Sequence, residues 1–300
     1  MLIFYFYLIS FSIIGYGFIL SKFLKINSMQ IGFIGLLGLS FLIFFSYITS
    51  IFFIHNYQFN SLTLGTGLIF FILFLYLKFN FIQKELKIFL AVFTLLIIFI
   101  LIGKNHDDFS YYHFPYSYLL TQYSHPIGLG WLNNGFRNPS SLFFLNSLFY
   151  LPKVDFFLFH ISPAYFLGFS NLILLKLIFD KNIYNKIKIV NFLSLLIFLF
   201  INIFFYRLAE HGTDKSGQII VFLLVILFIL LINNNKGKLL NYENSKVILF
   251  VFILLSVLIS LKPFISFERT GSIIISFIDL LIRSLFFEVN PKTKAPILPH

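Results

Sequence analysis

The sequence predicts an all-α protein, a polytopic transmembrane helical bundle. Three observations lead to this fold class. First, 59% of the 300 residues are hydrophobic and only 11% are charged, whereas a soluble domain carries about 25% charged residues. Second, apolar runs that approach the length of a membrane-spanning helix recur along most of the chain. Third, the lysines gather in short loops between those runs, as membrane orientation requires.

The predicted spans follow from length and apolarity, because a transmembrane helix needs roughly 20 mostly apolar residues. A weaker ninth stretch, Ser272–Phe287, has Asp279 and Arg283 on one helical face, so it fits an amphipathic surface helix as well as a ninth span. The apolar piece Leu142–Leu151 is too short to span and predicts an interfacial or re-entrant helix. The eight stronger spans are Leu2–Leu20, Ile31–Ile54, Leu64–Leu77, Ile88–Ile102, Phe156–Phe179, Asn191–Tyr206, Gln218–Ile232 and Val247–Leu261.

The loop charges predict the orientation. Every odd-numbered loop is basic, which predicts a cytoplasmic location for these loops. The N-terminus and the loops 103–155, 207–217 and 262–271 are then expected on the outer face, with all the unusual polar clusters. The lysines of the odd-numbered loops are Lys22, Lys25, Lys78, Lys84, Lys87, Lys181, Lys186, Lys188, Lys236, Lys238 and Lys246.

The amino-acid composition limits the cofactors and partners that the protein is expected to bind. The chain has no cysteine, so no disulfide and no thiolate metal site is expected. The net charge of +11 does not indicate nucleic acid, because the basic residues are scattered over loops between spans. The lipid bilayer is the expected partner. Residues 2–20 lack a basic start and a small-residue cleavage site, so they predict a first span and not a cleaved signal peptide. We find no internal repeat and expect one membrane domain over residues 1–300.

The main candidate for chemistry is an acidic segment that directly follows an apolar run. Asp107 and Asp108 are adjacent carboxylates, suited to a general base with an orienting partner or to oxygen ligands for a divalent cation. Their mutual repulsion is expected to raise one pKa. His106 and His113 are candidates for proton transfer or phosphate binding. No zinc motif is present. The alternative is an interfacial loop with solvated carboxylates.

Cationic side chains recur in the predicted outer loops. Arg137 is the only arginine of the long loop 103–155, and its guanidinium suits a phosphate, or simply the membrane interface. Arg207, His211, Asp214 and Lys215 lie close together between two apolar spans, where charges are costly unless they are solvated, paired or used. Asp214 is also favoured near the start of the next helix by the helix dipole. Lys262 is weaker evidence, because a lysine at a helix end is common.

These segments together resemble the GT-C superfamily of polytopic membrane glycosyltransferases. An apolar helix followed by Asp107-Asp108 and the aromatic residues up to Tyr112 is similar to the first outer loop of that family. The segment Arg137 to Phe143 is similar to the part that returns to the membrane. Arg207 and Asp214 resemble a later outer-loop element. The GT-C-like core is expected over 88–261, with extra spans over 1–87 and an atypical or truncated tail over 262–300.

The resemblance implies inverting transfer of a sugar from a polyprenyl-phosphate donor to an unidentified acceptor outside the bacterial cytoplasmic membrane. It implies Asp107 as the base that deprotonates the acceptor, with Asp108 orienting it. Any divalent cation would be held by these two carboxylates, and no other cofactor is expected. The other implied roles are phosphate binding by Arg137, Arg207, Lys215 and Lys262, and support by His106, His113, Tyr112, His211 and Asp214.

Three alternatives remain open at this point. A transporter or flippase of lipid-linked saccharides would need polar residues in mid-span, where Asn171, Asn191 and Asn202 are the few candidates. A polymerase or ligase of surface polysaccharide would also use lipid-linked sugars and outer-loop arginines. The short C-terminal part is also what an inactive fragment or a subunit of a larger enzyme would show.

Overall fold

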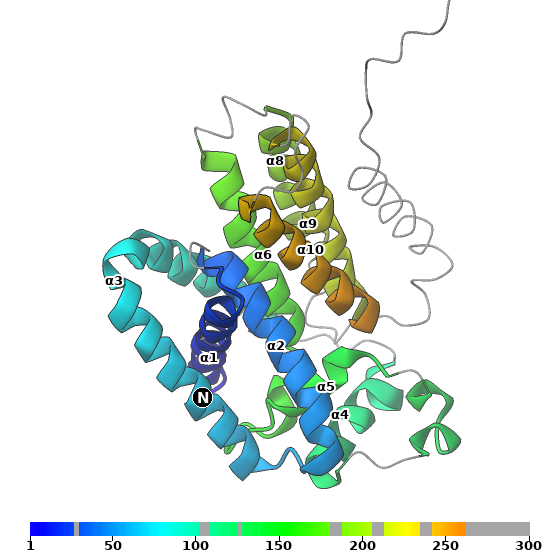
Figure 1. The fold of residues 1–300 in the computed structure, drawn as a ribbon. Helices are drawn as coiled ribbons and strands as arrows, with labels where there is room; N and C mark the ends of the chain where they lie inside the picture. Colours follow the sequence, from blue (N-terminus) through cyan, green and yellow to red (C-terminus); the bar gives the residue numbers. More distant parts are fainter. Residues whose placement is uncertain are drawn as a thin grey trace, which may run out of the picture.

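The computed structural model describes residues 1–26, 30–101, 108–124, 128–137, 139–180, 188–205, 213–234 and 242–261. These residues form helices and turns and no strand, so the predicted all-α class is confirmed. Long helices lie side by side in a bundle, and short helices cover one end of it (Figure 1). We call this end, where α4 and α5 lie, the loop end.

The helices of the bundle begin and end close to the predicted apolar runs. Pro163 stands in the first turn of α6, where its missing N–H needs no partner. Asp214 stands in the first turn of α9, where the helix dipole favours a carboxylate. The bounds are α1 Leu2–Phe23, α2 Ile31–Phe52, α3 Tyr57–Leu101, α4 Phe114–Gln122, α5 Ser141–Ser147, α6 Ser162–Phe179, α8 Lys188–Phe204, α9 Thr213–Asn234 and α10 Tyr242–Leu261.

Five helical stretches of the described residues are long and apolar enough to cross a membrane. Lys188–Phe204 and Val247–Leu261 are apolar but shorter. The stretch predicted as the ninth span, 272–287, lies outside the described residues. The five candidates are Leu2–Phe23, Ile31–Phe52, Tyr57–Phe79, Phe156–Phe179 and Asp214–Leu231.

The predicted third and fourth spans belong to one helix, α3, which curves at one end of the bundle (Figure 1). Both of its halves lie against α1, because the rings of Phe71 and Phe89 lie 4.8 and 5.8 Å from the ring of Phe11. In a straight helix these two residues would be about 27 Å apart. The chain therefore reverses without leaving the helical conformation, and the polar residues between the two apolar runs form a bend.

Glycines bring the first three helices into close contact. Gly38 on α2 faces the carbonyl oxygen of Ile13 on α1, and Gly17 on α1 faces that of Ile34 on α2. Added Cβ atoms would lie 1.9 and 1.8 Å from these two oxygens. Gly15 faces α3 in the same way. Small residues let membrane helices approach closely, because packing replaces the hydrophobic driving force in lipid.

The loop end is held to the bundle by a buried polar network around His55, in the turn between α2 and α3. The two ring nitrogens of His55 lie 3.0 Å from Thr49 Oγ1 and 2.6 Å from Ser147 Oγ. The backbone N–H of His55 donates to the carbonyl of Leu120 on α4. Asn60 donates to the carbonyls of His55 and Ser147. The network joins α2, α3, α4 and α5, and so fixes the surface on which the loop residues lie.

Candidate functional site

The acidic segment continues into a short π-helix, η1 (Phe109–His113), and then into α4. The carbonyl oxygen of Asp108 accepts hydrogen bonds from the N–H groups of Tyr112 and His113, at 3.0 and 3.3 Å. Single π-helical turns are rare and occur often at functional sites. Here the turn directs the half-buried Tyr112 and the buried His113 towards the Phe143 ring, at 5.8 and 5.1 Å.

Tyr112 connects three parts of the chain that are distant in sequence. Its ring packs on Gly135, where an added Cβ would lie 2.8 Å from the ring carbon Cγ. Burial raises the pKa of Tyr112, and the negative charges of Asp108 and Asp214 raise it further. Asp214 stands in the first turn of α9, so a charge on this helix acts on Tyr112. The phenol stays protonated at neutral pH and remains available as a hydrogen-bond donor.

The arginine loop, residues 128–137, consists of two short 3-10 helices, η2 (Leu129–Trp131) and η3 (Asn134–Phe136). Gly128 begins it with φ +92°, a conformation that favours glycine. The side chain of Asn133 donates to the carbonyl of Tyr111, which ties the loop to the acidic segment. Among the described residues, the exposed Arg137 side chain has one hydrogen bond, from Nε to the Gly130 carbonyl at 3.5 Å. Most donors of the guanidinium are therefore free to meet an anion.

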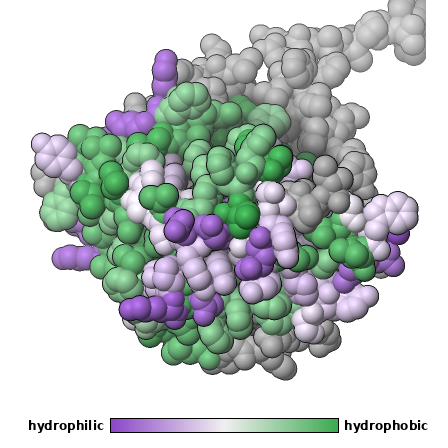
Figure 2. Space-filling model, turned by 90° about the horizontal axis from the view of Figure 1, so that it is seen from below, coloured by the Kyte–Doolittle hydropathy of each residue, from purple (hydrophilic) through white to green (hydrophobic). Residues whose placement is uncertain are grey.

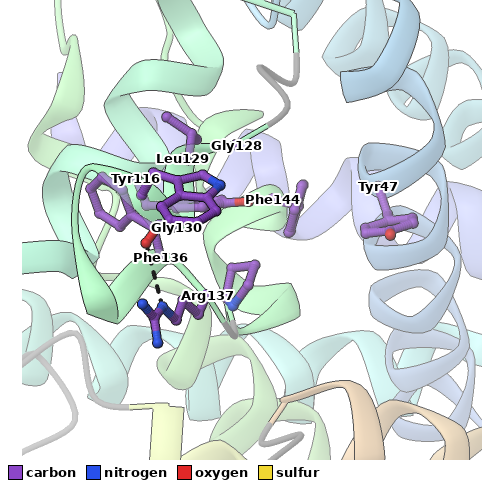
Figure 3. Close-up of a pocket in the computed structure, with 10 residues that line it drawn as sticks. Tyr47, Tyr116, Gly128, Leu129, Gly130, Phe136, Arg137 and Phe144 are labelled. Atoms are coloured by element: carbon purple, nitrogen blue, oxygen red, sulfur yellow. Dashed lines mark hydrogen bonds between the residues drawn. The ribbon is translucent and has the colours of Figure 1, made fainter.

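A cavity of about 660 Å³ lies between the arginine loop and α2. Figure 3 shows Tyr47 on α2 at one side of it, with Gly130 and Arg137 at the other. Aromatic rings from α4, α5 and η3 form much of the remaining wall. The lining residues are Tyr47, Tyr116, Gly128, Leu129, Gly130, Trp131, Phe136, Arg137, Pro139 and Phe144.

A second cavity, of about 550 Å³, lies between α2, α5 and α10. It shares Tyr47, Arg137, Pro139 and Phe144 with the first cavity, so the two cavities are neighbours and Arg137 lines both. Its other lining residues belong to the span candidate α2 and to the apolar helix α10, apart from Ser141 on α5. These residues are Ser40, Ile43, Phe44, Ser141, Ile253, Ser256, Val257 and Ser260.

Hydrogen bonds join α5 to α10 beside the second cavity. The hydroxyl of Ser140, which caps α5, donates to the carbonyl of Leu261, the last residue of α10, at 2.7 Å. The hydroxyls of Ser141 and Ser260 lie 2.9 Å apart. The predicted interfacial or re-entrant helix over 142–151 is the short α5, whose seven residues are all buried. α5 is therefore covered on all sides by its neighbours at the loop end.

The structure brings together several predicted site residues at the loop end. Asp108, Tyr112 and His113 lie on one segment, and Arg137 lies on the loop that packs against it. Asp214 influences Tyr112 from the start of α9, and the ammonium of its neighbour Lys215 lies 4.7 Å from the centre of the Phe205 ring. The other predicted residues, His106, Asp107, Arg207, His211 and Lys262, lie outside the described residues.

Two contributors to the site were missed by sequence reasoning. Tyr47 looked like an ordinary span residue, and the serines of α2 and α10 are dispersed among apolar residues. Helical spacing places Ser256 and Ser260 on one face of α10, but nothing local indicates which helix they meet. Within the described ranges, no three histidine or acidic side chains are grouped as metal ligands. A cation at the acidic pair therefore stays a prediction, because Asp107 is outside those ranges.

Comparison with known proteins gives one match. The model of a family described as a domain of unknown function, DUF8201, matches residues 1–285. No curated protein and no solved structure matches the chain.

Proposed function

The chain belongs to the DUF8201 family, whose function is unknown, and from its own residues we propose a membrane glycosyltransferase. In this proposal it moves a sugar from a polyprenyl-phosphate donor to an acceptor outside the bacterial cytoplasmic membrane. The observation that carries the proposal is the position of Arg137 where two cavities meet. A lipid phosphate needs a cation for its head and an apolar path for its chain. The cavity between α2 and α10 supplies the path, and the arginine supplies the cation.

The proposed reaction is a single displacement that inverts the anomeric carbon. The acceptor hydroxyl oxygen attacks that carbon, and the bond from the carbon to the phosphate oxygen breaks. Asp107 takes the proton of the hydroxyl, and the lipid phosphate leaves with the bonding electron pair. A positioned base of this kind gives about 10²–10⁴-fold acceleration. Cations near the leaving oxygen stabilise its charge, and we assign this role to Arg137, Arg207, Lys215 and Lys262.

Asp108 and Tyr112 are proposed to orient the acceptor beside the base. Asp108 accepts a hydrogen bond from a sugar hydroxyl, and the Tyr112 phenol donates one. The raised pKa of Tyr112, caused first by burial and then by the two nearby carboxylates, keeps this donor protonated. The remaining candidates, His106, His113, His211 and Asp214, are proposed as surrounding support.

A polymerase or ligase of lipid-linked saccharides is the nearest rival, because it would use the same arginine and the same apolar path. It differs in transferring a saccharide chain in place of one sugar. A transporter is less well supported. The side-chain amides of Asn171 and Asn202 pair with each other at 2.9 Å between α6 and α8, and Asn191 donates to the last carbonyls of α6. These contacts satisfy the mid-span asparagines that a polar path would need.

The proposal is tested with the full chain in lipid nanodiscs and a panel of polyprenyl-phosphate sugars labelled in the sugar. We expect one donor to release polyprenyl phosphate, with the rate abolished in Asp107→Asn and strongly lowered in Arg137→Gln. Asp155→Asn is the matched control. The Asp155 carboxylate also lies at the loop end, but it accepts a hydrogen bond from the Tyr57 hydroxyl and lines neither cavity. An unchanged rate in Asp107→Asn would refute the role of Asp107 as the general base. No turnover of any donor by the wild-type chain would refute the transferase.

The orientation is tested separately by labelling single cysteines with an impermeant thiol reagent, since the chain has no native cysteine. Tyr111→Cys lies on the exposed side of the acidic segment, and Lys25→Cys lies in the exposed turn after α1. Labelling of residue 111 from outside intact cells, with residue 25 labelled only after lysis, is the expected result. The reverse pattern would put the acidic segment in the cytoplasm and exclude the proposed acceptor side.

A further inference from the structure

The tip of the arginine loop carries the only tryptophan of the chain, and this side chain is almost wholly exposed. We call residues 128–132 the tryptophan tip. Trp131 is 91% exposed and its neighbour Leu132 is 79% exposed. Leu129, in contrast, is buried in a small apolar cluster with Tyr116 and other loop-end residues. The backbone thus anchors one side chain and directs two large apolar ones outwards.

The conformation of the tip is defined by its own hydrogen bonds. The N–H of Trp131 donates to the carbonyl of Gly128 at 2.9 Å, and the N–H of Leu132 donates to that of Leu129 at 3.0 Å. Gly128 has the left-handed φ with which the turn begins. The outward direction of the two apolar side chains is therefore a property of a folded turn and not of a random chain.

The depth of the tip relative to the membrane follows from its neighbour across the first cavity. Trp131 and Tyr47 line the same cavity. Tyr47 belongs to α2, whose span candidate ends at Phe52, so it lies roughly 8 Å from that end of the span. A loop that shares a cavity with this residue lies at the depth of the membrane surface and does not stand off in bulk water.

The side of α2 next to the cavity is also exposed and apolar. Phe44 is 65% exposed and Tyr47 is 51% exposed, and both line the second cavity, so large apolar side chains are accessible on this face of the span candidate. Seen from the loop end, hydrophilic residues, purple to white, lie among hydrophobic green ones on the same surface (Figure 2). Tryptophan and arginine are both well suited to this level, since an indole sits among headgroups and a guanidinium binds their phosphates.

We propose that Trp131 and Leu132 insert into the interfacial layer of the bilayer at the loop end. Inserted there, the tryptophan tip holds the rim of the first cavity against the lipid surface, beside the opening between α2 and α10. This inference concerns the bilayer and rests on the exposure, the turn geometry and the depth of Tyr47. It does not depend on the proposed activity.

The test uses the intrinsic fluorescence of the wild-type chain, which has a single tryptophan. The full chain is placed in nanodiscs of mixed phosphatidylcholine and phosphatidylglycerol, with or without bromine in the acyl chains. We expect a blue-shifted emission, loss of more than half of the intensity with brominated lipid, and little quenching by aqueous iodide. Red-shifted emission that iodide quenches and brominated lipid leaves unchanged would overturn the proposal.

Two reference variants calibrate the result. Tyr47→Trp combined with Trp131→Phe places the single indole within the span candidate of α2, roughly 8 Å from its end. Lys153→Trp combined with Trp131→Phe places it at an exposed, charged position of the loop end. Quenching of wild-type Trp131 close to that of the residue-47 reference supports insertion. Quenching close to that of the residue-153 reference contradicts it, whatever the chain catalyses.

Discussion

Replacing Gly38 by alanine tests the close approach of α1 and α2. The added Cβ would lie 1.9 Å from the carbonyl oxygen of Ile13, whereas ordinary contact begins at 3.4 Å. The oxygen belongs to the backbone, so the helices themselves must separate by more than an ångström. Overpacking of this kind costs about 1–3 kcal/mol, and we expect Gly38→Ala to lower the free energy of unfolding by an amount in this range.

Gly65 is the matched control for this substitution. It also lies within a membrane-spanning helix, but an added Cβ there meets nothing within 4 Å. Alanine is the better helix former by roughly 0.5–1 kcal/mol, so Gly65→Ala is expected to be neutral or stabilising. The two variants make the same chemical change and differ only in their surroundings.

The assay is equilibrium unfolding of the purified chain in mixed micelles, followed by circular dichroism as the denaturing detergent increases. Gly17→Ala, which faces the carbonyl of Ile34 at 1.8 Å, is expected to behave like Gly38→Ala. Equal stability of Gly38→Ala and Gly65→Ala would refute the argument, because it would mean that α1 and α2 are not in backbone contact at Gly38.

Three further predictions concern the loop end and the bundle. Burial lowers the pKa of His55 to about 4 from its ordinary 6.5, so the unfolded chain binds the proton at higher pH than the folded chain. The free energy of unfolding in detergent should therefore fall by roughly 3 kcal/mol as pH drops from 6.5 towards 4. His55→Gln should lose less stability over this range, and a pH profile identical to that of the wild type would contradict the prediction. Gly135→Ala should displace the Tyr112 ring and lower the free energy of unfolding by about 1–3 kcal/mol, with partial recovery on adding Tyr112→Leu; no recovery would argue against a steric cause. Asn171→Leu or Asn202→Leu alone should cost about 0.6–1.7 kcal/mol by orphaning an amide, and the double variant should cost less than the two single losses summed.

The membrane character of the protein could be predicted from sequence, because apolarity over a span length is a local property. The continuity of α3 could not be predicted in the same way. Leu64–Leu77 and Ile88–Ile102 are separated by Lys78, Lys84 and neighbouring polar residues, which read as a loop. In the structure α3 continues through them. Lysine, glutamate and glutamine are good helix formers, so polarity alone did not signal the end of a helix.

The candidate site was only partly predictable for a related reason. Arg137 and the acidic segment stood out, because charges and acidic pairs are rare in this chain. The contact of Gly135 with Tyr112, and the second cavity around Arg137, depend on which helices become neighbours. Gly32, Gly35 and Gly38 recur at intervals of three residues on α2. This recurrence of glycine was the available signal of close helix packing: Gly32 and Gly35 meet α6, and Gly38 meets α1.

The glycine contacts among α1, α2 and α3 also bear on the order in which the molecule assembles. The residues that form them end at Gly67 and Phe71, so all are synthesised before the arginine loop. Because chains fold from the N-terminus during synthesis, α2 can present Tyr47 on a packed helix before its cavity partners exist. The arginine loop then closes onto a surface that is already in place. A defect in that loop would leave an inserted N-terminal unit with an unfinished cavity, and not an unfolded chain.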